Sequence, residues 1–408
     1  MRVALLMLAV VGCQQEILPT PAPTPVVPAP VPVPIATTPF AVNNQLVGED
    51  GTIVKTLDGV NRYTVAVPDG PHRFVIGDVV VDTETGAMTK RIPDAAIIDD
   101  KNLVRYEPDG KVRWSVPVSG ARSVRPPDIA IGSGRVIITI NYVVHAFDDA
   151  NGREVWTAKL PGYRLQIKGA LAYTTWCNSP TKDHWLIGTD VVTGVEKFRT
   201  ALPMDCDPWL DVEDDFLIVT EDHPAKTQFF SLDGKLLLEL DEQAQGTRQL
   251  AFGKPVPVGD LKILATDKHL IALDRHAKVV WKRDHMHNTF VAGTQATQLP
   301  DGDLLIANFG QIDDSGVDIL RLHPDGSQVW HSCATGLGVG HSEYEHFAYV
   351  EPRGDELFVV SQGSYGQFLE RMSVKTGDRE LRCVLHAEQD VKEGCTKPPP
   401  CPQAQRTE

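Results

Sequence analysis

The sequence has little positive charge, no long apolar run beyond its first residues and no stretch with the periodicity of an amphipathic helix. Its 39 Lys and Arg residues stand against 54 Asp and Glu residues, a formal net charge of −15. A chain this acidic is a poor candidate for binding nucleic acid or anionic membranes through its surface field. No segment beyond the first twelve residues approaches the 18 apolar residues of a membrane-spanning helix. The 42% of hydrophobic residues still suffices for a packed core, which excludes a wholly disordered chain.

Several motifs of catalysis and cofactor binding are also absent. There is no Gly-x-Ser-x-Gly elbow, no pair of adjacent cysteines, and no twelve-residue EF-hand spacing in the acidic runs 211–215 and 313–318. The glycines of 336–340 do not open a helix after a strand, so they predict no dinucleotide loop. We therefore expect solvated turns at the acidic runs, and neither a metal nor a cofactor.

The N-terminus is typical of an exported chain. Arg2 precedes a short apolar run, and Val10-Val11-Gly12-Cys13 resembles the bacterial lipobox, whose cysteine is acylated. We predict that residues 1–12 are a lipoprotein signal peptide and that Cys13 is lipidated, with a plain signal peptide as the alternative. No Asp follows Cys13, which by the bacterial sorting pattern indicates the outer membrane and leaves periplasmic or surface exposure open.

A proline-rich segment follows the cysteine. Eight of the sixteen residues from Pro19 to Pro34 are proline, which favours a polyproline II conformation. At about 3.1 Å per residue, such a segment reaches about 50 Å. We predict a tether over 13–42 that holds a domain away from a membrane; a disordered leader of low complexity is the alternative.

Six cysteines remain after Cys13, an even number that predicts three disulfides in an exported chain. Six cysteines allow fifteen pairings, so the choice among them rests on position. Two pairs follow the repeat described next, and the third closes a small loop in a proline-rich tail. The expected pairs are Cys177–Cys206, Cys333–Cys383 and Cys395–Cys401.

A repeat of about 42 residues runs along the chain. In its clearest copy a strand-like run reaches Asp148, a turn follows to Gly152, and a second strand closes with Trp156. Glycine supplies the positive φ of such a turn, Asp bonds its backbone, and the closing aromatic packs between neighbouring sheets. The corresponding residues of other copies are Trp114, Asp190, Gly194, Phe198, Asp274, Trp281 and Trp330.

The pattern Ala-x-Asp-x-x-x-Gly-x-x-x-Trp of 146–156 resembles the repeat of quinoprotein-type propellers, the PQQ-like repeat. The resemblance implies an all-β fold over 43–386: a β-propeller of seven four-stranded antiparallel blades. Eight blades are the alternative, because 81–86 is a weak further copy with Lys90 in place of the aromatic. We expect residues 43–70 to supply a strand that closes the ring, and 387–408 to form a flexible tail.

Two enzyme classes compete with a binding role. Quinoprotein dehydrogenases share the repeat, but no residue here corresponds to one of their cofactor ligands. Propeller sulfotransferases use a nucleophilic histidine, and 299–306 resembles their repeats. Surface histidines are the simpler interpretation, because no pair has the His-Glu-x-x-His spacing of a zinc site. The histidines that cluster late in the chain are His285, His287, His331, His341 and His346.

The largest repeat spacings, 49 and 51 residues, lie between Trp281 and Leu381. Long loops on a rigid scaffold commonly carry binding surfaces. Three tryptophans lie off the repeat positions and are either core residues or interface anchors: Trp176, Trp185 and Trp209. The binding surface that we predict in the long-loop sector comprises His341, Glu343, Tyr344, His346, Tyr365 and Phe368.

The lipobox, tether, repeat type and size together resemble the propeller lipoproteins of the outer-membrane barrel-assembly machinery. The resemblance implies a non-catalytic scaffold of the cell envelope that binds a protein partner through propeller loops. Such a scaffold uses no cofactor, binds no nucleic acid and meets the membrane only through its lipid anchor. The longer tether departs from that family and leaves the partner open. The alternative hypothesis is an envelope enzyme with a His-centred or metal-dependent site.

Overall fold

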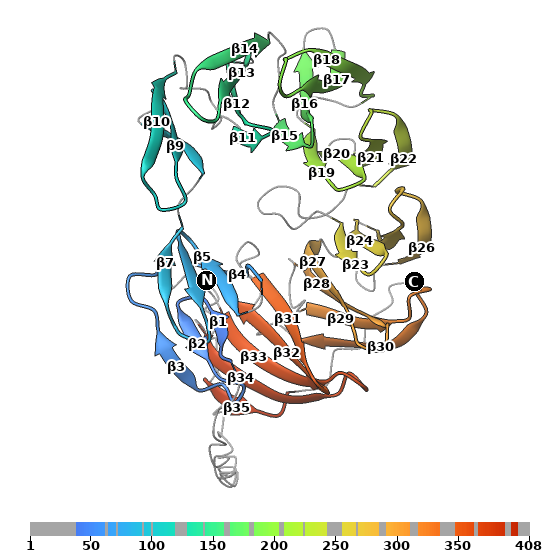
Figure 1. The fold of residues 1–408 in the computed structure, drawn as a ribbon. Helices are drawn as coiled ribbons and strands as arrows, with labels where there is room; N and C mark the ends of the chain where they lie inside the picture. Colours follow the sequence, from blue (N-terminus) through green and yellow to red (C-terminus); the bar gives the residue numbers. More distant parts are fainter. Residues whose placement is uncertain are drawn as a thin grey trace, which may run out of the picture. The chain divides into compact units, whose positions relative to one another are not determined.

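The computed structural model presents the chain as β-strands joined by turns (Figure 1). In the ranges it describes, every regular element is a strand, and no helix is long and apolar enough to cross a bilayer. Cys13 and most of the predicted tether lie outside these ranges. The described residues are 38–61, 64–70, 72–91, 94–98, 101–118, 129–141, 143–158, 164–178, 183–203, 208–222, 225–242, 255–266, 268–284, 291–310, 317–334, 347–362, 366–387 and 393–398.

These residues form nine antiparallel sheets, each built from strands that follow one another in the chain. The first sheet contains β1 (Phe40–Val42), β2 (Gln45–Val47) and β3 (Ile53–Thr56). The second contains β4 (Ala66–Pro68), β5 (Arg73–Ile76), β6 (Val79–Asp82) and β7 (Met88–Lys90). The third contains β8 (Ala95–Ile98), β9 (Asn102–Tyr106) and β10 (Val112–Pro117).

Three four-stranded sheets come next. The first of them contains β11 (Ile129–Gly132), β12 (Arg135–Ile140), β13 (Val143–Asp148) and β14 (Glu154–Ala158). The second contains β15 (Arg164–Lys168), β16 (Leu171–Asn178), β17 (Asp183–Asp190) and β18 (Glu196–Ala201). The third contains β19 (Trp209–Val212), β20 (Phe216–Asp222), β21 (Ala225–Ser231) and β22 (Leu236–Leu240).

The last three sheets complete the fold. The first of them contains β23 (Val256–Val258), β24 (Leu261–Ala265), β25 (His269–Leu273) and β26 (Val279–Asp284). The second contains β27 (Val291–Gln298), β28 (Leu304–Gly310), β29 (Val317–Leu322) and β30 (Gln328–Ala334). The final sheet contains β31 (Phe347–Arg353), β32 (Glu356–Gln362), β33 (Gly366–Ser373), β34 (Arg379–Ala387) and β35 (Gly394–Thr396).

The eight sheets from β4 onward are the blades of a propeller of about eight blades, and β1–β3 is a small additional sheet. The predicted all-β propeller of antiparallel, mostly four-stranded blades is confirmed, with eight blades in place of seven. The weak repeat copy at 81–86 accounts for the difference, because it is the turn of the complete sheet β4–β7.

The ends of the domain also differ from the prediction. The first strand begins at Phe40 rather than after residue 42, and β1 pairs with β2 instead of adding to the last blade. At the other end, β35 lies within the segment 387–408 that was expected to be a flexible tail, and it pairs with the outer edge of β34.

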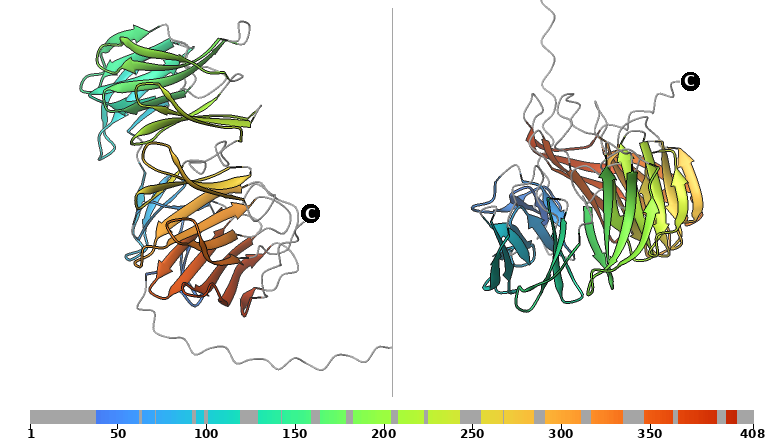
Figure 2. Two further views of the ribbon diagram at one scale, coloured as in Figure 1. Left: turned by 90° about the vertical axis from the view of Figure 1, so that its right-hand side faces the viewer. Right: turned by 90° about the horizontal axis from the view of Figure 1, so that it is seen from above.

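The sheets from β11–β14 onward follow one another face to face (Figure 2). Shared clusters of buried apolar side chains join each of them to the next. The central strands are therefore buried on both faces: all five residues from Val136 to Ile140 in β12 are buried. Strands covered on both sides favour a continuous apolar run over strict alternation, which explains the Val- and Ile-rich central segments. Each apolar cluster contains side chains from two or three neighbouring sheets. Phe216 of β20 and Ile271 of β25, for example, belong to the same cluster.

A second contact joins several of the sheets to their successors. The closing aromatic of one sheet lies against the glycine turn of the next, so Trp156 of β14 covers Gly194 in the turn before β18. The indole Nε1 of Trp156 donates to the Val191 carbonyl at 2.9 Å. Trp114, Trp281 and Trp330 donate in the same way to the carbonyls of Asp149, Pro324 and Val374. Four junctions therefore share one arrangement, an indole packed on a turn and hydrogen-bonded to it.

The turns themselves are fixed by the repeat aspartates. Asp190 accepts hydrogen bonds from the Val192 and Thr193 amides at 3.1 and 2.9 Å. The hydrogen bonds from Thr193 lower the pKa of Asp190 below its ordinary value. Asp274 likewise accepts from the amides of His276 and Lys278. The repeat sequence thus builds a rigid turn on which the preceding aromatic can rest.

The junctions around β1–β3 use other side chains in place of an aromatic. The turn at Gly51 lies against Cys383 of β34, which is disulfide-bonded to Cys395 of β35. The turn at Gly86 is covered by Lys55 of β3, whose Nζ donates to the Gly86 carbonyl at 2.8 Å. A disulfide and a lysine stem therefore occupy the position that indoles occupy elsewhere.

The Cys383–Cys395 bond corrects two of the expected pairings, Cys333–Cys383 and Cys395–Cys401. The physical reason is β35, which pairs Cys395 directly opposite Cys383 in the register of the last sheet. That strand carries no sequence signal of the repeat, so the repeat alone predicts a partner for Cys383 in the preceding blade. The side chains of Cys177, Cys206, Cys333 and Cys401 lie outside the described residues.

Two glycine substitutions test the contact between aromatic and turn. Gly194 and Gly134 have nearly equal φ angles, 73° and 72°, so alanine strains both backbones similarly. A Cβ on Gly194 would lie 2.7 Å from the Trp156 ring, whereas one on Gly134 meets nothing within 4 Å. We expect Gly194→Ala to lower the free energy of unfolding by about 1–3 kcal/mol more than Gly134→Ala, as overpacking does. Urea unfolding followed by circular dichroism measures both; equal losses would contradict the proposed role of the contact.

Candidate functional site

The strand order gives every blade two different ends. In sheet β15–β18, the turns 169–170 and 191–195 lie at one end, which we call the turn end. Segment 179–182, between β16 and β17, and segment 202–208, which leads to the next sheet, lie at the other, which we call the connection end. The indole contacts all lie at the turn end. The longer segments between strands, such as 241–255 and 335–346, belong to the connection end.

Most of the predicted binding surface falls in two segments at the connection end. His341, Glu343, Tyr344 and His346 lie between β30 and β31, and Tyr365 lies between β32 and β33; all five are outside the described residues. The binding surface at these five residues therefore stays a prediction.

Phe368 does not belong to that surface. Its side chain is 3% exposed and packs in the apolar cluster between the last two blades, with Leu357 and Met372. The Arg382 guanidinium lies over its ring at 4.9 Å. Phe368 was placed on the surface because of its nearness to Tyr365 in the sequence; it is in fact an inward-facing residue of β33.

Only some of the histidines and acidic runs singled out in the sequence lie within the described residues. His285 and His287 are outside the described residues, and so is the acidic run 313–318. No group of three His, Cys, Asp or Glu side chains within the described ranges is arranged to hold a metal ion. In the other acidic run, Glu213 accepts from Lys262 at 3.0 Å and Asp214 pairs with Lys168. These carboxylates therefore join neighbouring sheets.

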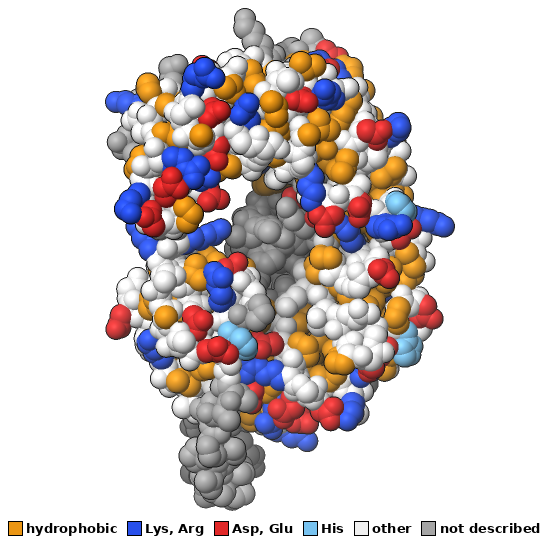
Figure 3. Space-filling view, viewed as in Figure 1, with side chains coloured by type: hydrophobic (Ala, Val, Ile, Leu, Met, Phe, Trp, Pro, Cys, Tyr) orange, Lys and Arg blue, Asp and Glu red, His pale blue; other side chains and the backbone are white. Residues whose placement is uncertain are grey.

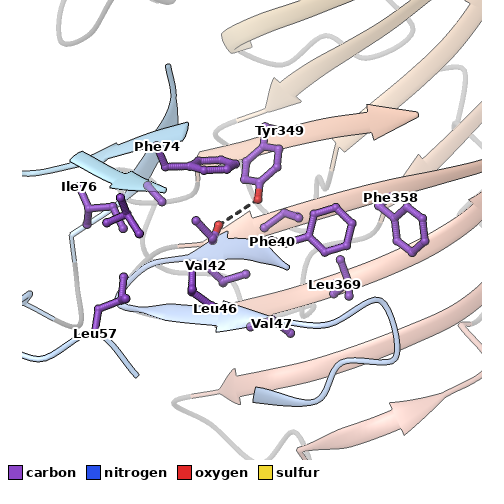
Figure 4. Close-up of a cluster of buried hydrophobic side chains, with 14 of the residues drawn as sticks. Phe40, Val42, Leu46, Val47, Leu57, Phe74, Ile76, Tyr349, Phe358 and Leu369 are labelled. Atoms are coloured by element: carbon purple, nitrogen blue, oxygen red, sulfur yellow. Dashed lines mark hydrogen bonds between the residues drawn. The ribbon is translucent and has the colours of Figure 1, made fainter. Parts of the chain in front are cut away.

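The first and last sheets close on one another through a shared apolar cluster (Figure 4). Phe40 of β1 lies 5.0 Å from Phe358 of β32, and Phe74 of β5 lies 5.3 Å from Tyr349 of β31, between ring centroids. The Tyr349 hydroxyl donates to the Ala41 carbonyl at 3.0 Å. Burial raises the pKa of Tyr349 well above its usual range, so the hydroxyl stays a neutral donor.

Arg353 secures the point at which the chain enters the fold. Its guanidinium lies 3.9 Å from the centre of the Phe40 ring and donates to the Thr38 carbonyl at 2.7 Å. Glu351 and Glu49 each accept from it at 2.8 Å. Burial opposes the charge, but these hydrogen bonds outweigh it and raise the pKa of Arg353. The last residues of the predicted tether segment, Thr38 and Phe40, are thus held by charge, stacking and hydrogen bonds together.

The three tryptophans outside the repeat lie in neighbouring blades. Trp176 of β16 pairs across the sheet with Trp185 of β17, and both are half-buried. Trp209, the first residue of β19, is half-buried beneath Arg164, whose guanidinium carbon lies 3.7 Å from the ring centre. Arg164 cannot be singled out from the sequence, because nothing in a propeller repeat marks a cation on the first strand of a blade.

Surface charge is mixed rather than gathered by sign. Acidic and basic side chains lie beside one another over the face drawn in Figure 3. Elsewhere in the described ranges, exposed charges pair within a turn, as Lys111 does with Asp109 and Lys235 with Asp233. Such exposed pairs contribute little to stability, and the mixed charge leaves no broad basic surface on the face drawn.

Fold and repeat define the class of the protein: a propeller whose blades carry an Asp-to-Gly turn and a closing aromatic. The family described as outer membrane protein assembly factor BamB matches residues 99–353, more than half of the chain. The chain therefore belongs to this PQQ-like propeller family, which confirms the resemblance inferred from the repeat.

The chain is similar to several solved structures at low sequence identity. BamB from Moraxella catarrhalis is 14% identical, with 79% of this chain and 92% of that chain covered and a TM-score of 0.39. A eukaryotic initiation factor is 10% identical, with 86% and 97% covered and a TM-score of 0.55, a likeness of fold alone. No curated protein matches the chain in sequence.

A tyrosine substitution tests the closure. Tyr349→Phe removes the buried hydrogen bond to Ala41, and we expect a loss of about 1–2 kcal/mol in the free energy of unfolding. Tyr173→Phe is the matched control, since the Tyr173 hydroxyl donates to the Leu232 carbonyl at 3.1 Å away from the closure. Only Tyr349→Phe should speed proteolytic cleavage within residues 38–61. Equal cleavage of the two variants would contradict a specific role in closure.

Proposed function

We propose that the protein is a non-catalytic, lipid-anchored scaffold of the cell envelope that binds a protein partner at the connection end. The observation that carries this proposal is the difference between the two ends of the blades. At the turn end, short turns are filled by indole contacts. The longer segments between strands, including 335–346, belong to the connection end. A rigid frame that presents longer segments on one side suits partner binding.

Membership of a family described as an outer membrane protein assembly factor supports an envelope location and a protein partner. The proposed anchor is Cys13, acylated after removal of residues 1–12, with the tether running from Cys13 to the residues before β1, which begins at Phe40. The hydrogen bond from Arg353 to the Thr38 carbonyl supports a tether role. A force on the tether would act first on the apolar cluster around Phe40 and Phe358, in which the first and last sheets meet. Outer-membrane attachment follows from the residue after Cys13, and the exposed side of that membrane is left to experiment.

Crosslinking in intact cells tests the scaffold role. We expect one envelope protein to be captured reproducibly, and the capture to be lost when 335–346 and 363–365 are replaced by Gly-Ser segments of equal length. The matched control replaces 243–254, twelve residues like 335–346, between other blades of the same end. Capture of nothing above background would contradict the scaffold role and would direct metal analysis and substrate screening to the histidine-rich sector.

Cell fractionation tests the anchor. Cys13→Ser should leave the signal peptide uncleaved and remove the acyl groups, because lipoprotein processing requires the cysteine. Mass spectrometry of the N-terminal peptide distinguishes an acylated Cys13 in the parent chain from an intact leader in the variant. A parent chain that begins elsewhere, or that lacks acyl mass, would overturn the lipoprotein assignment.

A further inference from the structure

Arg164 and Trp209 form a contact between two neighbouring blades at the connection end. Each is the first residue of the first strand of its blade, β15 and β19, and the guanidinium lies over the indole at 3.7 Å. Beside them the Thr175 hydroxyl donates to the Pro208 carbonyl, which ties β16 to the start of β19. The stack is therefore built on strands, so its orientation is fixed by the frame.

The charge of Arg164 has no counterion within the described part of the chain. Its Nε is buried without a hydrogen-bond partner, and no carboxylate lies within ion-pair distance of it there. Every other buried or half-buried arginine in the described ranges pairs with a carboxylate or donates to an oxygen. These others are Arg105, Arg135, Arg283, Arg321, Arg353, Arg371, Arg379 and Arg382.

That Arg164 has no counterion among the described residues is unusual in a chain with 54 acidic and 39 basic residues. A guanidinium stays charged at every pH that a protein meets, and a buried donor without a partner costs free energy. Stacking on an indole lowers the cost of desolvating one face of the cation but does not neutralise it. The indole covers one face of the guanidinium, so the N–H groups along its edge are the part that remains for a ligand. The spacing of these groups matches the two oxygens of a carboxylate.

We propose that Arg164, stacked on Trp209, is a carboxylate-binding subsite that receives an acidic side chain or the C-terminal carboxylate of a partner protein. The proposal rests on the proposed function and extends it by giving the chemistry of one contact. Trp209 is the positioning residue: it holds the fork in one orientation, so that little rotamer freedom is lost on binding. A polyanion such as nucleic acid is disfavoured by the net charge of −15.

Fluorine NMR on the full chain labelled with 5-fluorotryptophan measures this binding directly, because Trp209 lies under the cation. The Trp209 resonance is assigned with Trp209→Phe. The probes are acetyl-Glu₄-amide, acetyl-Gln₄ with a free C-terminus, acetyl-Gln₄-amide and inorganic phosphate. We expect a saturable shift with at least one of the two carboxylate peptides and none with acetyl-Gln₄-amide. The responding peptide identifies the side chain or the terminus as the source of the carboxylate.

Variants at Arg164 establish the contact. Arg164→Gln should weaken binding by about tenfold or more, and Arg164→Lys should weaken it less, because it keeps the charge and loses the fork. Arg199→Gln is the matched control, since Arg199 lies 5.7 Å from the Trp185 ring and already pairs with Glu196. Unchanged dispersion of the other fluorine resonances shows that each variant is folded.

Several results would overturn the proposal: no shift with either carboxylate peptide, an equal shift with acetyl-Gln₄-amide, a response to phosphate alone, or unchanged affinity in Arg164→Gln. The outcome is independent of partner capture in cells. Capture without peptide binding would leave the scaffold role standing and remove this subsite. Peptide binding without capture would leave a carboxylate site on a protein that is not a stable scaffold.

Discussion

The contact between a closing side chain and the turn of the next blade is the interaction on which the rest of the structure depends. Trp156 on Gly194 shows its parts: an apolar ring, a residue without a side chain beneath it, and a hydrogen bond from the indole to the turn. A β-carbon at the turn would meet the ring, so the glycine is required by the packing as well as by its φ angle. Because the same contact recurs at five junctions, each of these sheets positions its successor.

The contact also distinguishes the two ends of the blades. It fills the turn end, where the chain reverses in a few residues, and it leaves the connection end free of this constraint. The junctions around β1–β3 also place a side chain against a glycine turn, but it is not an aromatic. The Cys383–Cys395 disulfide lies against Gly51, and Lys55 lies against Gly86. The chain enters the fold beside this closure, at a point gripped by Arg353. The arrangement of the blades, the point at which the chain enters the fold and the difference between the two ends thus follow from one repeated packing contact.

Much of the fold could be predicted from the sequence, because the turn and the closing aromatic recur at a fixed spacing. The sequence predicts seven blades instead of eight, because in the repeat copy at 81–86 Lys90 replaces the aromatic residue that marks the other copies. The pairing of Cys383 could not be predicted, because it depends on β35, an added strand outside the repeat. Only one residue of the Arg164–Trp209 stack can be singled out from the sequence. Trp209 is a tryptophan outside the repeat positions, whereas its partner is determined by the packing of two blades.

Amide hydrogen exchange at two turns of one blade tests the central claim most directly. The Gly326 amide donates to the His323 carbonyl and the Gly302 amide to the Leu299 carbonyl, both at 2.9 Å and both at the turn end of β27–β30. Trp281 covers Gly326, whereas Gly302 has no such neighbour within 4 Å. The account predicts that the Gly326 amide exchanges more slowly by about a hundredfold or more. Equal exchange rates at the two glycines would contradict it.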